Sequence, residues 1–289
     1  TVDVAGTPLA PGDRIIWAYA YCGRCYYCVI AHQPTLCTTF TPYGYADCSP
    51  PPHLLGGFAQ YAYVLPQCHV VKVPDGVPSH WASSASCALR TIMHATARAG
   101  GIHPAETVLV QGSGPVGLYA VAAARAFGAR HVLCFGAPDH RLDVATAFGA
   151  DAVCNIDKTD AKQRLEVIRQ YTEGRGADLS FECSGSHHAL EETIGALRLG
   201  GRAVIIGAGD PQPAQISGMA FIMKQISIIG VRSAGIEYYR EALHFLATHK
   251  DRFPFERMFG ATYGLAEIGH AMEKMHRLEE IKPVVDPFS

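Results

Sequence analysis

Four cysteines stand close together near the start of the chain, in the run YCGRCYYCVIAHQPTLC. Cys22, Cys25 and Cys28 follow one another at intervals of three residues, and Cys37 comes nine residues later. Four thiolates at such spacing suit the tetrahedral coordination that zinc prefers, and Gly23 permits the tight turn that directs several sulfurs inward. A closed four-sulfur site leaves no position for a substrate, so we expect this zinc to be structural.

Two other interpretations of the cysteine run stay open. An iron–sulfur cluster can use similar spacing, but the bacterial ferredoxin run places its fourth cysteine closer to the third and follows it with proline. Here Thr38 follows the fourth cysteine, which favours zinc over the cluster. The second alternative is a set of four unliganded or partly oxidised thiols.

The composition is that of a compact globular protein. The 289 residues are 48% hydrophobic and 17% charged, with a formal net charge of −2. This balance gives no basic face, so we expect no nucleic acid partner, and no apolar run is long enough to predict a membrane span. Clustered thiols and the lack of a charged-then-apolar leader predict a cytoplasmic protein rather than a secreted disulfide scaffold.

A glycine-rich turn follows a short apolar run in TVLVQGSGPVGLYAVAAARAFGA, which begins at Thr107. The apolar residues 108–110 predict a buried parallel strand, and an alanine-rich helix should run to about Phe127. Between them lies G-x-G-x-x-G, the turn that places a helix N-terminus against the pyrophosphate of a dinucleotide. The residues that we assign to the cofactor here are Gly112, Gly114, Pro115, Val116 and Gly117.

The end of the next strand bears on the choice between NAD and NADP. A carboxylate about twenty residues after the glycines would bind the ribose diol of NAD. Gly136 stands there instead, and His140 and Arg141 lie close enough in sequence to attract a 2′-phosphate. The sequence therefore favours NADP, although Asp139 could reach the ribose and restore NAD, or simply cap the following helix.

Alternating strand-like and helical segments continue along the chain. Including the two strands above, six strands are expected, the number of a complete doubly wound parallel sheet. Their expected ranges are 108–110, 131–135, 151–156, 177–183, 201–207 and 225–231. Helices are expected at 161–172 and 189–200. Residues 1–90 differ, with glycine and proline punctuation and short alternating strands such as GGFAQYAYVL at 56–65.

These motifs together resemble the zinc-containing medium-chain alcohol dehydrogenases (the medium-chain dehydrogenase/reductase family). The matching segments are PGDRI, CGRCYYC, GGFAQY, CALRTIMHA, VLVQGSGPVGL, RGADLSFECSG, GGRAVIIG and IKPVV, which span nearly the whole chain. The resemblance implies an α/β protein with a Rossmann sheet and a mostly-β, GroES-like catalytic domain. It implies a partial GroES-like domain at 1–90 with a zinc lobe at 21–38, a Rossmann domain at 91–245, and a return to the catalytic domain at 246–289.

The resemblance also implies a second, catalytic zinc. Cys87 matches its third ligand, Thr91 matches a residue beside the nicotinamide, and Gly207 matches a cofactor-binding glycine. The family's first two ligands, a cysteine and a histidine often followed by glutamate, would lie upstream of Thr1, so we expect the family's N-terminal segment to be missing from this chain. The rival explanation is a short protein without a complete catalytic zinc site.

The function implied is a zinc-dependent oxidoreductase that transfers a hydride between NAD(P) and an alcohol, aldehyde or ketone. One alternative is a zinc-independent quinone or enoyl reductase of the same superfamily, whose branches generally lack the cysteine lobe. Another is a non-catalytic nucleotide-binding relative. The partners expected are a small alcohol or carbonyl substrate and further copies of the chain, as a homodimer or homotetramer.

Overall fold

The computed structural model describes residues 1–209 and 211–289, which form two compact units. The first unit comprises Thr1–Arg90, Ser233–Asp251 and Phe255–Ser289, and the second comprises Thr91–Arg232 and Arg252–Pro254. In the described residues no helix is both long and apolar enough to cross a membrane.

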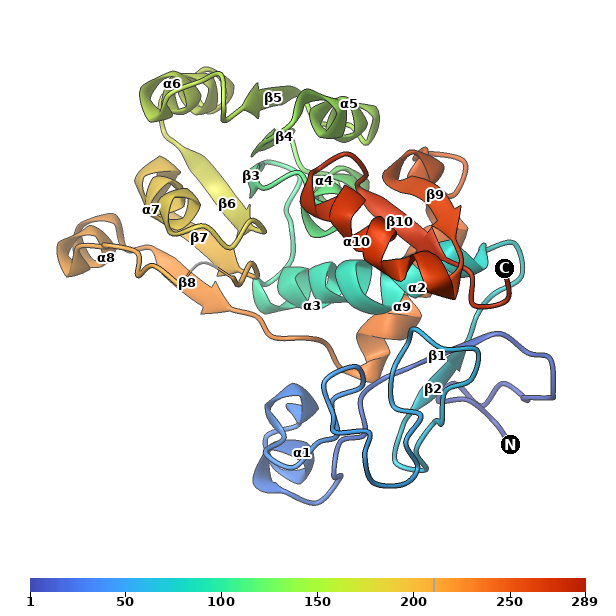
Figure 1. Ribbon diagram of the computed structural model, residues 1–289. Coiled ribbons are helices and arrows are strands. Elements are labelled where there is room, and N and C mark those ends of the chain that lie inside the picture. Colours follow the sequence, from blue (N-terminus) through green and yellow to red (C-terminus); the bar gives the residue numbers. More distant parts are fainter. Residues whose placement is uncertain (210) are drawn as a thin grey trace. The chain divides into compact units, whose positions relative to one another are not determined.

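The second unit is built on a parallel sheet of six strands in the order β5-β4-β3-β6-β7-β8 (Figure 1). The strands are β3 (Thr107–Gln111), β4 (His131–Gly136), β5 (Ala152–Asn155), β6 (Ala177–Glu182), β7 (Leu197–Ile205) and β8 (Ser227–Gly230). The chain leaves β3 toward β4 on one side and later returns to β6 on the other, so the connections diverge beside β3. This is the expected doubly wound fold, and the divergence marks where such sheets bind ligands.

Two pairs of helices pack against this sheet. α4 (Pro115–Ala126) packs beside α5 (Asp139–Ala147), and α6 (Ala161–Tyr171) packs beside α7 (His187–Ala196). Leu109 of β3 is fully buried in a cluster with Ile168 of α6. Neighbouring residues of a strand point to opposite faces, so both faces of β3 need apolar cover, which its continuous apolar run predicts.

The junction of α7 and β7 differs from the expectation. The helix predicted to continue to residue 200 ends at Ala196, and β7 begins at Leu197, which pairs with Ala177 of β6. Gly200 adopts a φ of +70°, a left-handed conformation that a helix interior does not contain. The glycine pair 200–201 therefore belongs to an irregular strand. Farther along the chain, α8 (Gly218–Lys224) precedes β8.

The first unit contains two small sheets and several helices. β1 (Ile15–Trp17) pairs antiparallel with β2 (Val70–Lys72), and β9 (Phe259–Tyr263) pairs parallel with β10 (Lys282–Val285). Its helices are α1 (Tyr26–Val29), α2 (Ser79–Ser84), α9 (Ile236–His249) and α10 (Ile268–His276), with 3₁₀ turns at Pro34–Leu36, Phe255–Met258 and Leu265–Glu267. α9 packs against β1 and β2.

Residues 56–65 form no strand, contrary to the expectation from GGFAQYAYVL. Tyr61 and Tyr63, which would share one face of a strand, are 70% and 45% exposed, so the alternation does not correspond to a buried sheet face. A different local structure was also missed between α2 and α3 (Arg90–Arg98), where Ala85–Leu89 forms a π-helical turn. Such turns often lie at functional sites.

Candidate functional site

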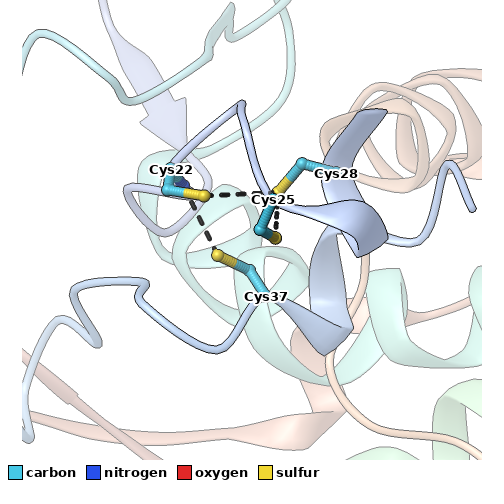
Figure 2. A group of neighbouring side chains, drawn as sticks. All are labelled: Cys22, Cys25, Cys28 and Cys37. Carbon is cyan, nitrogen blue, oxygen red and sulfur yellow. Dashed lines mark hydrogen bonds between the residues drawn. The ribbon is translucent and has the colours of Figure 1, made fainter. Parts of the chain in front are cut away.

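The four cysteines of the first unit converge on one point (Figure 2). Their Sγ atoms all lie within 4.8 Å of one another. Cys25 Sγ lies 3.6 Å from Cys28 Sγ, and Cys22 Sγ lies 4.0 Å from Cys28 Sγ. Four sulfurs placed tetrahedrally around zinc would stand about 3.8 Å apart, so this donor set fits the metal with little movement.

Local backbone structure brings the sulfurs together. Gly23 has a φ of +66°, which allows the turn after Cys22, and the Cys28 N–H donates to the Cys25 carbonyl over 3.0 Å at the start of α1. The 3₁₀ turn at 34–36 then returns the chain, and the Cys37 N–H donates to Pro34. The Cys22 N–H donates in turn to Cys37 Sγ at 3.5 Å.

The surroundings of the cluster favour one thiolate even without a metal. Hydrogen bonds from the Thr39 hydroxyl and from the Arg24 backbone lower the pKa of Cys22 to about 5. Burial raises the pKa of Cys28 to about 12. Zinc binds thiolates and would displace the remaining protons, so its affinity should rise with pH. The cluster therefore has the ligand set of a closed, structural zinc site.

The glycine-rich turn of the second unit lies at the carboxyl end of β3. Gly112 has a φ of +106°, and a Cβ on Gly117 would stand only 1.8 Å from the Gly112 carbonyl oxygen. Only glycine allows this approach of the first turn of α4 to the strand end. Gly114 precedes Pro115 at the start of α4, and a Cβ on Gly114 would meet no atom within 4 Å. Open space thus adjoins the helix N-terminus, where an anion is stabilised.

The end of β4 has no room for a carboxylate. A Cβ on Gly136 would lie 2.4 Å from Ser113 Oγ and 2.8 Å from the Ser113 backbone nitrogen. Ser113 is itself 3% exposed and donates to the Ala137 carbonyl at 3.1 Å. The absence of the acidic residue is therefore built into the packing of the turn.

The charged residues after Gly136 differ in how far they are exposed to solvent. His140 is exposed, whereas Arg141 is 7% exposed and burial lowers its pKa. Asp139 accepts hydrogen bonds from Asn155 at 2.6 Å and from Lys158 at 2.5 Å. Lys158 is thus a further cation at this sheet edge that sequence reasoning missed, because only the fold brings the end of β5 beside α5.

Gly207 lies at the carboxyl end of β7, where two loops meet. A Cβ on Gly207 would be 2.1 Å from the Gly185 nitrogen and 2.8 Å from Glu182 Oε2. The buried Glu182 carboxylate accepts from the backbone N–H groups of Ser184 at 2.7 Å and Gly185 at 3.0 Å. Gly207 therefore allows close packing of the two loops, and the sequence did not reveal the role of Glu182.

Cys87 lies in the π-helical turn 85–89, and its side chain is exposed. It lines a cavity of about 500 Å³ formed entirely by residues of the first unit. Thr91 follows in the first turn of α3 and is 9% exposed. The structure thus presents Cys87, unlike the fully buried Cys134, to a space large enough for a small molecule.

Cys87 has no complete metal site around it in the described residues. Within 1–209 and 211–289, the four-cysteine cluster alone brings three or more histidine, cysteine or carboxylate ligands together. Cys87 would supply one of the ligands that a catalytic zinc needs. The described residues therefore do not by themselves form a second zinc site.

Comparison with known proteins gives two family matches. Residues 1–75 match the alcohol dehydrogenase GroES-like domain, and residues 115–248 match the zinc-binding dehydrogenase family. The chain is 30% identical to 5-exo-hydroxycamphor dehydrogenase of Pseudomonas putida, covering 99% of this chain and 78% of that protein. It is 29% identical to sorbitol dehydrogenase of Bacillus subtilis, covering 95% and 70%.

Solved structures agree with these matches. An alcohol dehydrogenase from Thermotoga maritima superimposes with a TM-score of 0.93 at 30% identity, over 98% of this chain and 78% of that one. An alcohol dehydrogenase from Thermus sp. ATN1 gives a TM-score of 0.80 at 26% identity, over 96% and 80%.

The cysteine cluster leads to a first prediction. Cys22→Ser should remove one bound zinc per chain and lower the melting temperature, because the remaining three thiols cannot close the tetrahedral site. Elemental analysis and scanning calorimetry would measure both effects. Cys48→Ser, at an exposed cysteine outside the cluster, is the matched control. Equal zinc content in Cys22→Ser and in the unmodified protein would contradict the assignment.

Proposed function

The chain belongs to the zinc-containing medium-chain alcohol dehydrogenases, and on that premise we propose how its residues serve the NAD(P)-dependent interconversion of an alcohol and a carbonyl compound. Two sites take part in the proposal, the cavity at Cys87 in the first unit and the glycine-rich turn in the second. The four-cysteine cluster takes no part in the reaction, because four sulfurs saturate its zinc. The small-molecule substrate is an alcohol in one direction and an aldehyde or ketone in the other.

The observation that carries the proposal is the exposed Cys87 thiol on the wall of the cavity. We assign it as one ligand of a catalytic zinc, whose remaining ligands would come from outside the described residues. When bound, such a zinc supplies Lewis-acid polarisation of the substrate oxygen. Thr91, one helical turn after Cys87, is assigned to the nicotinamide, in agreement with its place in the family motif.

The cofactor assignment uses the carboxyl ends of β3, β4 and β7. Gly112, Gly114, Pro115, Val116 and Gly117 would face the pyrophosphate, and Gly207 would permit the loop packing beside it. We propose NADP rather than NAD, because Gly136 excludes a carboxylate and Asp139 is already bonded to Lys158. His140 is exposed at the start of α5, where its ring N–H could donate to a 2′-phosphate. Lys158 has three N–H donors, so it could contact the same phosphate while it stays bonded to Asp139. Arg141, which is buried in α5, would contribute its positive charge to the same 2′-phosphate site.

We further propose that the chain forms a homodimer or homotetramer through β8 and α8. β8 is an edge strand of the six-stranded sheet, and unpaired edges attract further strands. The neighbouring α8 carries three exposed apolar side chains, Met219, Ile222 and Met223, with exposures of 61%, 71% and 69%. Together these features form an apolar edge that a second copy could cover.

We also propose a cytoplasmic location, which cell fractionation would check. No cysteine forms a disulfide bond within residues 1–209 and 211–289, as expected in a reducing compartment.

A second prediction concerns Cys87. Cys87→Ala should lower kcat/KM for alcohols at least about a hundredfold while the binding of NADPH changes less than about twofold, because Cys87 would hold the zinc that polarises the substrate oxygen. Steady-state kinetics and cofactor fluorescence would separate the two effects. Cys48→Ala is the control, at an exposed cysteine that does not line the cavity. Unchanged turnover in Cys87→Ala would favour the zinc-independent reductase instead.

A third prediction concerns the cofactor. NADPH should bind about tenfold more tightly than NADH, since Gly136 leaves no carboxylate at the end of β4 and the Asp139 carboxylate is already bonded to Asn155 and Lys158. The double variant His140→Gln with Lys158→Gln removes the two side chains that the proposal assigns to the 2′-phosphate, and should abolish this preference by weakening NADPH binding alone. Fluorescence titration would give the dissociation constants, with Lys162→Gln, at an exposed lysine outside this group, as control. Tighter binding of NADH by the unmodified protein would refute the assignment.

A fourth prediction tests the oligomer. Ile222→Glu combined with Met223→Glu should reduce the mass in solution to that of a monomer, because burying two carboxylates in an apolar interface is costly. Light scattering coupled to size-exclusion chromatography would measure the mass. Phe288→Glu, at a residue that is 70% exposed outside α8 and β8, is the control. A monomeric unmodified protein, or a double variant of unchanged mass, would contradict the interface.

A further inference from the structure

Arg90 is a buried cation on the wall of the cavity that contains Cys87. Its side chain is 5% exposed. The Nε–H donates to the Ser86 carbonyl, and Nη1 donates to Ser233 Oγ at 2.7 Å. The guanidinium also lies 4.7 Å from the ring centroid of Tyr239 and 5.9 Å from that of Tyr19.

These contacts leave the charge of Arg90 without a counter-ion. In the part of the chain that the structure describes, no carboxylate pairs with Arg90. A guanidinium has five N–H groups, and the two hydrogen bonds leave three of them without an acceptor among the residues that the structure describes. Because arginine stays protonated, its burial is costly unless an anion or strong acceptor completes its shell.

The other residues around the cavity do not supply that anion. The lining contains no aspartate or glutamate and consists of Arg14, Ile15, Ile16, Trp17, Tyr19, Tyr43, Gly57, Val73, Ser79, Ala82, Ser83, Ser86, Cys87, Arg90 and Tyr239. The second cation, Arg14, donates to the carbonyl oxygens of Val77 at 2.7 Å and Pro74 at 3.4 Å. Burial raises the pKa of Tyr239, so its hydroxyl stays neutral beside Arg90.

We propose that this cavity binds the carboxylate of the substrate through Arg90, so that the enzyme acts on hydroxy acids and the corresponding oxo acids. A planar guanidinium with free N–H groups matches a carboxylate, which can accept two parallel hydrogen bonds. Aromatic and aliphatic walls would cover the apolar part of the molecule. A phosphate dianion suits the site less well, because only one of the two cations is deeply buried.

This inference names the class of substrate and rests on the proposed function for the oxidation of the alcohol group. In the oxidation, the carbinol C–H bond breaks and its hydride reduces the nicotinamide ring of NADP⁺. The hydroxyl proton leaves to solvent, and a C=O double bond forms. The carboxylate is unchanged by the reaction and serves only to hold the substrate. Arg90 is therefore a specificity-determining residue, acting on binding rather than on hydride transfer.

Benzoate is the probe for a direct test, because it joins a carboxylate to an aromatic ring and undergoes no reaction with the cofactor. Calorimetric titration of the full-length protein should show benzoate binding. Arg90→Gln should weaken this binding about tenfold to a hundredfold, the usual loss when a hydrogen bond to a charged group is removed. Arg90→Lys keeps the charge and should lose less.

Kinetics with a matched pair of alcohols extend the test. For 4-(hydroxymethyl)benzoate, Arg90→Gln should raise KM by a similar factor with little change in kcat. For benzyl alcohol, which lacks the carboxylate, KM should change less than about twofold. Arg14→Gln removes a positive charge from the same cavity and should weaken benzoate binding less than Arg90→Gln does.

Several results would overturn the inference. One is the absence of benzoate binding by the full-length protein together with a lower melting temperature in Arg90→Gln, which would mean that a carboxylate of the protein itself occupies Arg90. Another is equal weakening by Arg14→Gln and Arg90→Gln, which would show only a general attraction. If benzoate binds through Arg90 but neither alcohol is oxidised, the proposed function fails while the carboxylate site stands.

Discussion

The close approach of backbone segments at the carboxyl end of the parallel sheet constrains the whole second unit. A Cβ on Gly117 would stand 1.8 Å from the Gly112 carbonyl, and a Cβ on Gly207 would stand 2.1 Å from the Gly185 nitrogen. These contacts fix how α4 begins and how the loops after β6 and β7 meet. An open helix N-terminus and a carboxylate-free strand end follow from the same packing, and they suit a phosphate-bearing cofactor.

The first unit contains cysteines in two different settings, a closed cluster and a cavity wall. The four sulfurs of the zinc cluster face one another, so a metal there would be saturated and would only hold the lobe together. Cys87 instead stands on a cavity wall beside the buried charge of Arg90, where a molecule can enter. The π-helical turn at 85–89 joins these features, because it carries Cys87 and leads directly into α3 with Arg90 at its start.

The sequence predicts features that depend on local pattern and misses those that depend on tertiary contacts. The six strands and the glycine turn follow from apolar runs and punctuation, and the cysteine spacing predicts the observed cluster. The predicted strand at 56–65 does not form, since alternation alone cannot show whether a partner strand exists. The contact of Lys158 with Asp139 could not be predicted, because the fold brings these two residues together. The position of Arg90 on a cavity wall could not be predicted either, because residues far apart in sequence form that cavity.

The central claim is that this chain contributes a ligand to a reactive zinc in addition to holding a structural one. The most direct test is the number of zinc ions per protomer, measured by elemental analysis on full-length protein whose mass has been verified. We expect two, one at the four-cysteine cluster and one at Cys87. A value of one, with the four-cysteine cluster occupied, would contradict it and would favour a zinc-free reductase or a nucleotide-binding protein without catalysis.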